Sequence, residues 1–308
     1  MRWKVLISAP YMQPVIDDFR QFFKENDIEL FVPKVKERLE EKDLLSIIED
    51  IDGVICGDDR FTKKVLSKAK KLKVISKWGT GIDSIDQEAA EELNISVCNT
   101  PNAFTDPVAD SVLGYILSFA RQIPWSTKKM QAGQWQKIPG VALQECTLGI
   151  IGLGYIGRAV VKRAIAFGMT VLGNDIKDVR ENGVKICAKE EVLKTADFIS
   201  LHCDLNPTSF HLIGEKELSF MKPNTYLINT ARGPIIDEKA LIKTLQQKQI
   251  AGAALDVFEV EPLPKNSPLR KMKNCLLASH NANSSPSAWQ KVHQNTINNL
   301  LTGLRKSE

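Results

Sequence analysis

The chain has neither a long apolar run nor a strong excess of one charge. Its apolar stretches are all shorter than the roughly 18 residues that a membrane-spanning helix requires. Of its 308 residues, 41 are Lys or Arg and 37 are Asp or Glu, which gives a formal net charge of +4. Because the two signs are mixed along the chain, the composition predicts no membrane partner and no nucleic-acid partner.

One basic cluster interrupts this mixture, between Lys63 and Lys73. Its apolar residues recur at helical spacing, which places the lysines on the opposite, solvated face of a helix. The cluster therefore indicates a surface helix. The apolar positions are Val65, Leu66, Ala69 and Leu72.

Cysteine and histidine are few and scattered. The six cysteines form no C-x-x-C pair, and the four histidines do not stand at metal-ligand spacing. Several cysteines lie inside apolar, strand-like runs, so we expect buried thiols and no metal site. Because the N-terminus also lacks a long apolar signal segment, these features together predict a cytoplasmic protein.

The most informative stretch runs from Leu148 to Asp175. Leu148 to Ile151 is a short apolar run typical of a buried strand, and it leads directly into Gly152-Leu-Gly154-Tyr-Ile-Gly157. Apolar residues then recur at helical spacing, which predicts a strand, a glycine turn and a helix. In such a motif the glycines allow a tight turn, a close approach of the backbone to a pyrophosphate, and close packing of the helix on the strand.

Asp175 ends the second apolar run, about 20 residues further on, as a dinucleotide motif requires. Its carboxylate can accept hydrogen bonds from the adenosine ribose hydroxyls and would repel a 2′-phosphate. No arginine follows directly, so we predict NAD(H). Lys177 and Arg180 are close enough in sequence to weaken the preference over NADP(H).

Strand-like and helix-like patterns alternate from one end of the chain to the other, which implies parallel sheets with helices on both faces. The length suggests about two domains. In the first domain, Asp43–Glu49 and Thr62–Ala69 are expected as amphipathic helices. The expected strands are Val5–Ser8, Glu29–Val32, Gly53–Cys56, Val74–Ser76 and Ile95–Cys98.

The turn-rich segment Thr100–Pro107 indicates a linker, and Pro107 suits the first turn of a helix that runs to Ala120. This helix is apolar around much of its surface, which fits either a two-fold homodimer or burial within one chain. The last helix, Ser287–Leu304, is expected to cross back to the first domain. Further strands are expected near Leu148, Thr170, Phe198, Tyr226, Ala251 and Cys275.

We therefore predict an α/β fold of two doubly wound parallel-sheet domains. A Rossmann dinucleotide-binding domain, residues 100–280, is inserted in a smaller flavodoxin-like domain, residues 1–99 plus 281–308.

Ionisable residues stand at the ends of the later strands, where the sites of open α/β sheets are found. Arg232 precedes a glycine that permits a sharp turn, so its guanidinium can hold a carboxylate through two hydrogen bonds, or it makes a surface ion pair. Glu261 follows the next strand and His280 the last. A carboxylate beside one ring nitrogen favours the protonated imidazole, so this pair can deliver a proton; a structural hydrogen bond is the alternative for His280.

Together these motifs resemble those of the D-isomer-specific 2-hydroxyacid dehydrogenase family, nearest to its phosphoglycerate dehydrogenase-like branch. The resemblance covers nearly the whole chain. It is carried by the glycine motif with Asp175 and by five further segments: Lys77-Trp-Gly-Thr-Gly-Ile-Asp83, Thr100–Asp110, Asn229-Thr-Ala-Arg-Gly233, Asp256-Val-Phe-Glu-Val-Glu-Pro262 and Ser279-His280.

The resemblance implies an NAD-dependent oxidoreductase that transfers hydride between the cofactor and a small 2-oxo or 2-hydroxy acid, which the smaller domain would bind. Arg232 would bind the acid, His280 would be the acid and base, and Glu261 would pair with His280. Arg232 and His280 would also border the nicotinamide. The other implied contacts are the substrate carboxylate on the backbone of Thr80 and Gly81, the nicotinamide beside Thr230, Ala231 and Asp256, and the pyrophosphate on the backbone of Tyr155 and Ile156.

Departures from the family pattern leave the acid open. Cys56-Gly-Asp-Asp-Arg60 has two carboxylates where branches that bind phosphorylated substrates often have arginines. This disfavours phosphohydroxypyruvate, although Arg60, Arg2 and Lys77 are candidates for a phosphate. In related formate dehydrogenases a glutamine stands at the position of Glu261, so this residue argues against formate oxidation.

The segment Asn281-Ala-Asn-Ser-Ser285 offers amides either to a polar substrate tail or to the loop backbone. Trp289 either caps the pocket or packs in the core, and the core is favoured. No constellation comparable to that of His280 is evident around His202, His211 or His293.

Two other classes of function stay open. Some relatives of the family are NAD(H)-sensing corepressors, and they would look alike in sequence. An alanine dehydrogenase-like or homocysteinase-like enzyme is the other alternative, against which Glu261 and His280 count. The length leaves no room for the added regulatory domain that some phosphoglycerate dehydrogenases carry.

Overall fold

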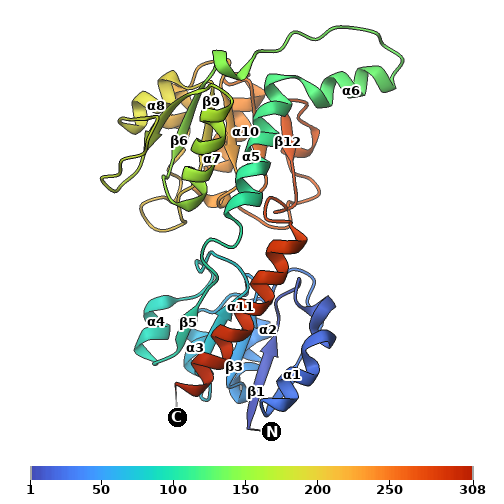
Figure 1. The fold of residues 1–308 in the computed structure, drawn as a ribbon, viewed down its shortest axis with the longest axis vertical. Helices are drawn as coiled ribbons and strands as arrows, with labels where there is room; N and C mark the ends of the chain where they lie inside the picture. The colour runs from blue at the N-terminus through green and yellow to red at the C-terminus, as the bar shows by residue number, and fades with distance from the viewer. Residues whose placement is uncertain (1, 307–308) are drawn as a thin grey trace. The chain divides into compact units, whose positions relative to one another are not determined.

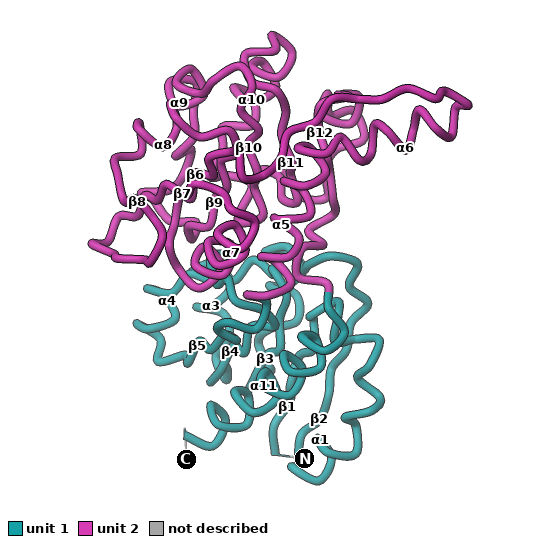
Figure 2. Tube along the Cα trace, turned by 45° about the horizontal axis from the view of Figure 1, so that its top comes forward, with its two compact units in different colours: residues 1–104, 285–308 teal, residues 105–284 magenta. Residues whose placement is uncertain are grey.

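The computed structural model describes residues 2–306, and this part of the chain divides into two compact units (Figure 2). Unit 1 extends to Phe104 and resumes at Ser285, and unit 2 is Thr105–Ser284. The divisions fall a few residues later than the sequence suggested, because the turn-rich segment before Thr105 stays with unit 1. Within the described residues, none of the helices has both the length and the apolar character needed to cross a membrane.

Unit 1 is built on a parallel sheet that, in the described residues, has five strands in the order β2-β1-β3-β4-β5. This is the flavodoxin-like order expected from the sequence. Every residue of β3 and β4 is buried, as expected for strands covered on both faces. The strands are β1 (Trp3–Ile7), β2 (Ile28–Phe31), β3 (Gly53–Cys56), β4 (Val74–Lys77) and β5 (Ser96–Cys98).

Three short helices of unit 1, α2 (Glu41–Leu45), α3 (Lys63–Lys68) and α4 (Gln87–Glu92), pack into one apolar core. The α3 helix begins where the hydroxyl of Thr62 accepts a hydrogen bond from the N–H of Val65, and α4 begins with a similar cap from Asp86. The lysines of α3 are exposed while Val65 and Leu66 are buried, which confirms the surface-helix interpretation.

The chain returns to unit 1 through α11 (Pro286–Arg305), which packs against β3 and β4 (Figure 1). Its buried face includes Val292, Ile297 and Leu300. The prediction that the last helix crosses back is confirmed. The remaining α-helix of this unit is α1 (Arg20–Glu25), which follows a 3₁₀ helix over Gln13–Phe19.

Unit 2 is a second parallel sheet, with the order β12-β11-β10-β9-β6-β7-β8 in the described residues. The strands β6, β7 and β8 follow one another outward on one side of the sheet. The chain then returns and places β9 on the other side of β6, so the strand order reverses there. This reversal is where open α/β sheets bind dinucleotides. The strands are β6 (Thr147–Ile151), β7 (Thr170–Asn174), β8 (Val184–Ile186), β9 (Phe198–Leu201), β10 (Tyr226–Asn229), β11 (Gly252–Leu255) and β12 (Cys275–Leu277).

Helices cover both faces of this sheet. One apolar cluster joins the sheet to α5 (Thr105–Ala120) and α7 (Tyr155–Ala166). A second cluster joins it to α8 (Lys189–Thr195), α9 (Glu215–Phe220) and α10 (Glu238–Gln246). Short 3₁₀ helices complete the chain at Ile48–Asp50, Leu143–Glu145, Gly233–Ile235 and Pro268–Lys271. The predicted fold of two doubly wound parallel-sheet domains is confirmed.

Two local predictions were incomplete. The helix expected over Asp43–Glu49 is α2, which ends at Leu45 and is followed by a separate 3₁₀ turn. The sequence also gave no signal for β8, whose residues are exposed or half-buried at the sheet edge. Nor did it indicate α6 (Ile123–Gln131), which buries none of its residues and extends away from the rest of unit 2 (Figure 1).

Candidate cofactor and active site

The glycine turn between β6 and α7 has the geometry of an anion cradle. Gly152 has a φ of +95°, and a Cβ there would lie 2.6 Å from the carbonyl carbon of His202. A Cβ at Gly157 would lie 2.1 Å from the carbonyl oxygen of Gly152, so the first turn of α7 packs directly on the strand exit. At Gly154 a Cβ would meet nothing within 4 Å. Each glycine therefore serves one need of the motif, and the space at Gly154 is left for a ligand.

A cavity of about 390 Å³ opens beside this turn, and its wall includes Gly152, Gly154, Tyr155 and Asp175. One carboxylate oxygen of Asp175 accepts the N–H of Leu153 at 2.7 Å, and the other accepts the N–H of Lys177 at 2.9 Å. Each oxygen keeps a lone pair that can accept a ribose hydroxyl. The first N–H groups of α7, from Tyr155 to Gly157, have no acceptor within the helix and suit a pyrophosphate.

The residues present therefore fit a dinucleotide. A second observation agrees, at the end of β10: the hydroxyl of Thr230 is buried and has no hydrogen-bond partner among the described residues. The next residue, Ala231, donates its N–H to the side-chain oxygen of Asn229 at 3.0 Å. A polar group of a ligand would satisfy the Thr230 hydroxyl, because buried polar atoms normally have a partner.

Arg232 stands directly after β10, and the turn around it is held by two close contacts. The Asn229 side-chain amide donates to the carbonyl of Arg232 at 2.8 Å. A Cβ at Gly233 would lie 1.9 Å from the carbonyl carbon of Phe258, so only glycine allows these two segments to touch. Asn229 is part of the sequence motif that ends at Gly233, but the motif predicted no role for it. In the structure, Asn229 shapes this turn.

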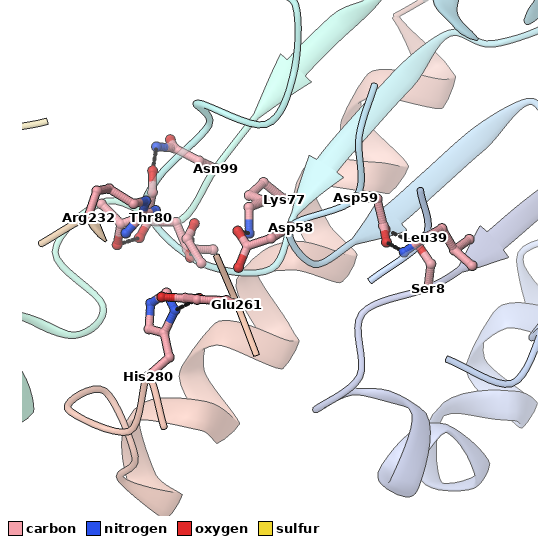
Figure 3. Close-up of polar contacts among 12 residues, drawn as sticks. Ser8, Leu39, Asp58, Asp59, Lys77, Thr80, Asn99, Arg232, Glu261 and His280 are labelled. Atoms are coloured by element: carbon pink, nitrogen blue, oxygen red, sulfur yellow. Dashed lines mark hydrogen bonds and ion pairs between the residues drawn. The ribbon is translucent and has the colours of Figure 1, made fainter. Parts of the chain in front are cut away.

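Glu261 and His280 are brought together at the ends of β11 and β12 (Figure 3). The Nδ1 of His280 lies 3.0 Å from one carboxylate oxygen of Glu261, and the other oxygen accepts the N–H of Phe258 at 2.9 Å. The pair thus engages Nδ1 of the ring and not Nε2. Because β10, β11 and β12 are neighbours, Arg232, Glu261 and His280 all follow adjacent strands at one sheet edge.

Asp256 fixes the loop that carries His280. Its two carboxylate oxygens accept the N–H groups of Asn281 at 2.8 Å and Ala282 at 2.9 Å, and its carbonyl accepts the N–H of His280 at 2.8 Å. His280 has a φ of +55°, a left-handed conformation that is uncommon for an L-residue, and these hydrogen bonds hold it. Burial raises the pKa of Asp256. The sequence did not predict that Asp256 holds this loop, because the contact depends on the path of the chain after His280.

The loop after His280 uses its polar groups internally. The side-chain oxygen of Asn281 accepts the hydroxyl of Ser284 at 2.7 Å, and the carbonyl of Asn281 accepts the N–H of Ser284 at 3.0 Å. The two predicted partners of this segment were a polar substrate tail and the loop backbone. Asn281 forms its hydrogen bonds within the loop.

In unit 1, the two carboxylates after β3 have different surroundings (Figure 3). Asp58 lies 2.9 Å from the ammonium of Lys77, whose side chain is 5% exposed. Asp59 points inward, has no exposed surface and accepts hydrogen bonds from the Ser8 hydroxyl and the N–H of Leu39. Arg2 precedes β1 and lies at the opposite end of the strand, with its guanidinium over the ring of Trp3. The structure therefore does not favour Arg2 as a phosphate ligand.

The loop after β4 carries Thr80 and Gly81 and is braced by the segment after β5. Gly79 has a φ of +132°, and its carbonyl accepts both the N–H and the hydroxyl of Thr100 at 2.9 Å. The carbonyl of Thr80 accepts the amide of Asn99 at 2.6 Å. The loop is thus shaped within unit 1, and its predicted contact with a carboxylate stays a prediction.

The other histidines have structural partners. No constellation like that of His280 was expected around His211. Its Nε2 nevertheless lies 2.7 Å from a carboxylate oxygen of Glu259, which corrects that expectation. The ring of His202 lies 2.9 Å from the Ser200 hydroxyl, and burial lowers its pKa to about 3. The Nδ1 of His293 accepts the indole N–H of Trp78 at 2.9 Å.

Trp289 is half-buried and packs on the exposed Tyr11 and the buried Trp78 in unit 1, so its place in the core stays a prediction. Among the described residues, no group of three or more His, Cys, Asp or Glu side chains is arranged to hold a metal ion.

The fold and the glycine turn define an α/β protein with a dinucleotide-binding Rossmann domain. The chain belongs to the D-isomer specific 2-hydroxyacid dehydrogenase family: the model of that family's NAD binding domain matches residues 113–282. NAD is therefore the cofactor that this domain binds.

Relatives with curated names support the same family. The chain is 41% identical over 293 residues to a D-3-phosphoglycerate dehydrogenase of Methanocaldococcus jannaschii, covering 92% of this chain and 54% of that protein. It therefore spans about half the length of that relative. It is also 40% identical over 276 residues to a glyoxylate reductase of Thermofilum pendens, covering 86% of this chain and 81% of the relative.

Among solved structures, the chain is similar to a D-lactate dehydrogenase of Aquifex aeolicus in complex with NAD and lactic acid. The TM-score is 0.85 at 26% identity, with 96% of this chain and 93% of the other covered.

Proposed function

We propose that this protein is an NAD-dependent D-2-hydroxyacid dehydrogenase. The observation that carries the proposal is the His280–Glu261 pair, whose residues follow β12 and β11, the two strands next along the sheet from the β10 strand that precedes Arg232. An imidazole held at Nδ1 by a carboxylate can give a proton from Nε2 and take it back, which is what interconversion of a carbonyl and an alcohol requires.

The side chains divide the chemistry. Arg232 binds the carboxylate of the acid and orients its carbonyl, because a guanidinium can donate two parallel hydrogen bonds. His280 transfers a proton to the carbonyl oxygen as the hydroxyl forms, and Glu261 stabilises the imidazolium before transfer. The cofactor, when bound, supplies the hydride to C2 in reduction and accepts it in oxidation. The backbone of Thr80 and Gly81 holds the other side of the substrate carboxylate.

Thr230, Ala231 and Asp256 line the nicotinamide end of the cofactor site. The unpartnered hydroxyl of Thr230 supports this assignment. Asp256 already accepts two backbone N–H groups, and it retains lone pairs for a carboxamide. Gly152, Gly154, Tyr155, Ile156, Gly157 and Asp175 form the pyrophosphate and adenosine end.

The substrate is a small 2-oxo acid, and relatives named for phosphoglycerate and for glyoxylate leave both a phosphorylated and a short acid to be tested. The pairing of Lys77 with Asp58 supports an unphosphorylated acid, because the cation is already neutralised.

The deciding experiment follows NADH and NADPH oxidation with hydroxypyruvate, phosphohydroxypyruvate, glyoxylate, pyruvate and bulkier 2-oxo acids. We expect one acid to be preferred with NADH. The control is His280→Ala, which should lose about a hundredfold or more in turnover while NADH still binds. Turnover by the wild type on none of the acids, with NADH bound and a protein partner recovered, would instead favour the NAD(H)-sensing corepressor.

We also propose a cytoplasmic homodimer that acts on small molecules and not on nucleic acid. All six cysteines are thiols, as in a reducing compartment. The helix that suggested a dimer, α5, buries most of its apolar residues within unit 2. The support for a dimer comes instead from α6 and the segment after it, where Trp135 is 91% exposed.

A further inference from the structure

A charged cluster beside the dinucleotide cavity takes no part in the proposed transfer of hydride or proton. Arg158, on the first turns of α7, lines this cavity together with Asp175 and Lys177. Its Nε donates to the carbonyl of Leu153 at 2.9 Å, and its Nη1 pairs with the carboxylate of Glu181. The guanidinium is thus tied both to the glycine turn and to the loop that follows β7.

Asp175 sets the local charge at this end of the cavity. Its two oxygens are oriented by the N–H groups of Leu153 and Lys177, so the carboxylate cannot turn away without losing both hydrogen bonds. A ribose 2′-hydroxyl can donate to it, whereas a 2′-phosphate would meet a fixed negative charge.

Arg158 is the side chain best suited to reverse that preference. A guanidinium binds phosphate through paired hydrogen bonds, and this one is anchored at the cavity wall by Leu153. Lys177 and Arg180 lie on the loop with exposed side chains, and holding a phosphate there would cost them side-chain entropy. The guanidinium of Arg158 already has an ion-pair partner, however, because it is bound by Glu181, whose side chain is 23% exposed.

We propose that Glu181 is a specificity residue for the cofactor and acts through Arg158. By pairing with Arg158, Glu181 keeps the guanidinium from a 2′-phosphate, and with Asp175 it makes the site selective for NAD over NADP. Glu181 is a positioning residue, because its carboxylate acts on Arg158 and not on the cofactor. The inference concerns binding alone and does not depend on which acid is reduced.

The test is a double-mutant cycle with Glu181→Gln and Asp175→Ser, read as the dissociation constants of NADH and NADPH for the full chain by calorimetry. A charge-assisted hydrogen bond to phosphate is worth about tenfold or more in affinity, so Glu181→Gln should shift the ratio of the two constants toward NADPH by about that factor. The shift should be larger in the Asp175→Ser background. Glu181→Asp keeps the carboxylate and should therefore keep the wild-type ratio of the two dissociation constants.

Two further variants separate selectivity from structure. Arg158→Gln, added to the double variant, should abolish the gain for NADPH. Glu190→Gln removes a carboxylate that pairs with Lys194 on the exposed surface of α8, and it should leave the ratio unchanged. Equal weakening of NADH and NADPH by Glu181→Gln would mean a merely structural role and would overturn the proposal.

Fragments keep the test decisive if the Asp175 variants do not fold. Adenosine 2′,5′-bisphosphate and adenosine 5′-monophosphate differ only in the 2′-phosphate, and both can be titrated into the wild type and Glu181→Gln. We expect Glu181→Gln to gain affinity for the bisphosphate alone. An unchanged preference between the two fragments would contradict the role of Glu181, while NADH binding and turnover would be untouched.

Discussion

Asp59 carries a carboxylate with no exposed surface, held by the hydroxyl of Ser8 and the N–H of Leu39, both at 2.5 Å (Figure 3). Burial raises the pKa of Asp59 to about 6, whereas an aspartate in an unfolded chain titrates near 4. Between these values the folded chain keeps a proton that the unfolded chain has released. The free energy of unfolding therefore falls as the pH rises from about 4 to about 6, and the loss persists above that range.

Asp59→Asn should remove this dependence. An asparagine keeps an oxygen for the N–H of Leu39 and offers an N–H to the Ser8 hydroxyl, so both contacts survive. We expect the variant to gain stability over the wild type as the pH rises from about 4 to about 6, by roughly 3 kcal/mol at most. Urea unfolding at several pH values measures this. Parallel stability profiles for the two chains would show that Asp59 is not the titrating group.

Glu261→Gln tests the charge on the residue that faces His280. A glutamine can still accept from Nδ1 but no longer stabilises the imidazolium, so the protonated ring is lost at lower pH. Reduction of the 2-oxo acid needs that proton. The fall of kcat/KM with rising pH should therefore begin earlier, and turnover at neutral pH should drop by about ten- to a hundredfold.

The matched control for this substitution is Glu259→Gln, two residues away. Glu259 faces His211 instead and accepts the N–H of Glu238 at 3.2 Å, which a glutamine also permits. We expect its pH profile to follow that of the wild type. The same shift in both variants would indicate that the loop, and not the charge of Glu261, sets the profile.

At the scale of elements, the contact of Gly233 with Phe258 joins the turn after β10 to the segment after β11. Gly233→Ala would place a methyl group 1.9 Å from the carbonyl carbon of Phe258, so the backbone of one segment must move. That movement displaces Arg232 or Glu261. We expect turnover to fall by about a hundredfold or more while NADH still binds, because misplaced catalytic groups lose most of their effect.

Gly114→Ala is the control for that substitution. Gly114 lies inside α5, and a Cβ there would meet nothing within 4 Å. Alanine should leave turnover unchanged and stabilise the helix by roughly 0.5 to 1 kcal/mol. If both variants kept full turnover, the contact of Gly233 with Phe258 would not position the catalytic residues.

The same elements show what could be predicted from the sequence. Strands covered on both faces are continuous apolar runs, and the residues that follow parallel strands gather at one edge, so the fold and the meeting of Glu261 with His280 could be inferred. The inward turn of Asp59 and the pairing of Arg158 with Glu181 could not. These contacts depend on the path of each loop and on side-chain rotamers, which leave no periodic signal. β8 was missed for a similar reason, because a short edge strand buries too little to impose a pattern.

At the scale of the whole molecule, the segment from Ile123 to Val141 packs on unit 2 through Trp125, which stacks on Phe119, but several of its large apolar side chains stay exposed. Its helix, α6, buries no residue, and Trp135 is 91% exposed. Large exposed apolar side chains gathered on one segment mark an interaction surface, and a second copy of the chain is the partner that a symmetric assembly provides. The other exposed apolar residues of this segment are Ile123, Met130 and Val141.

We therefore expect sedimentation equilibrium to give twice the mass of one chain. Replacing Ile123 and Trp135 together by serine should shift the equilibrium toward the monomer, because burial of two large apolar side chains is worth about 1.5 to 3 kcal/mol each. Leu93→Ser, at an exposed leucine of unit 1, should leave the mass unchanged. If the double variant sedimented as a dimer, association would use another surface, and the exposed segment would have to be covered by a different partner.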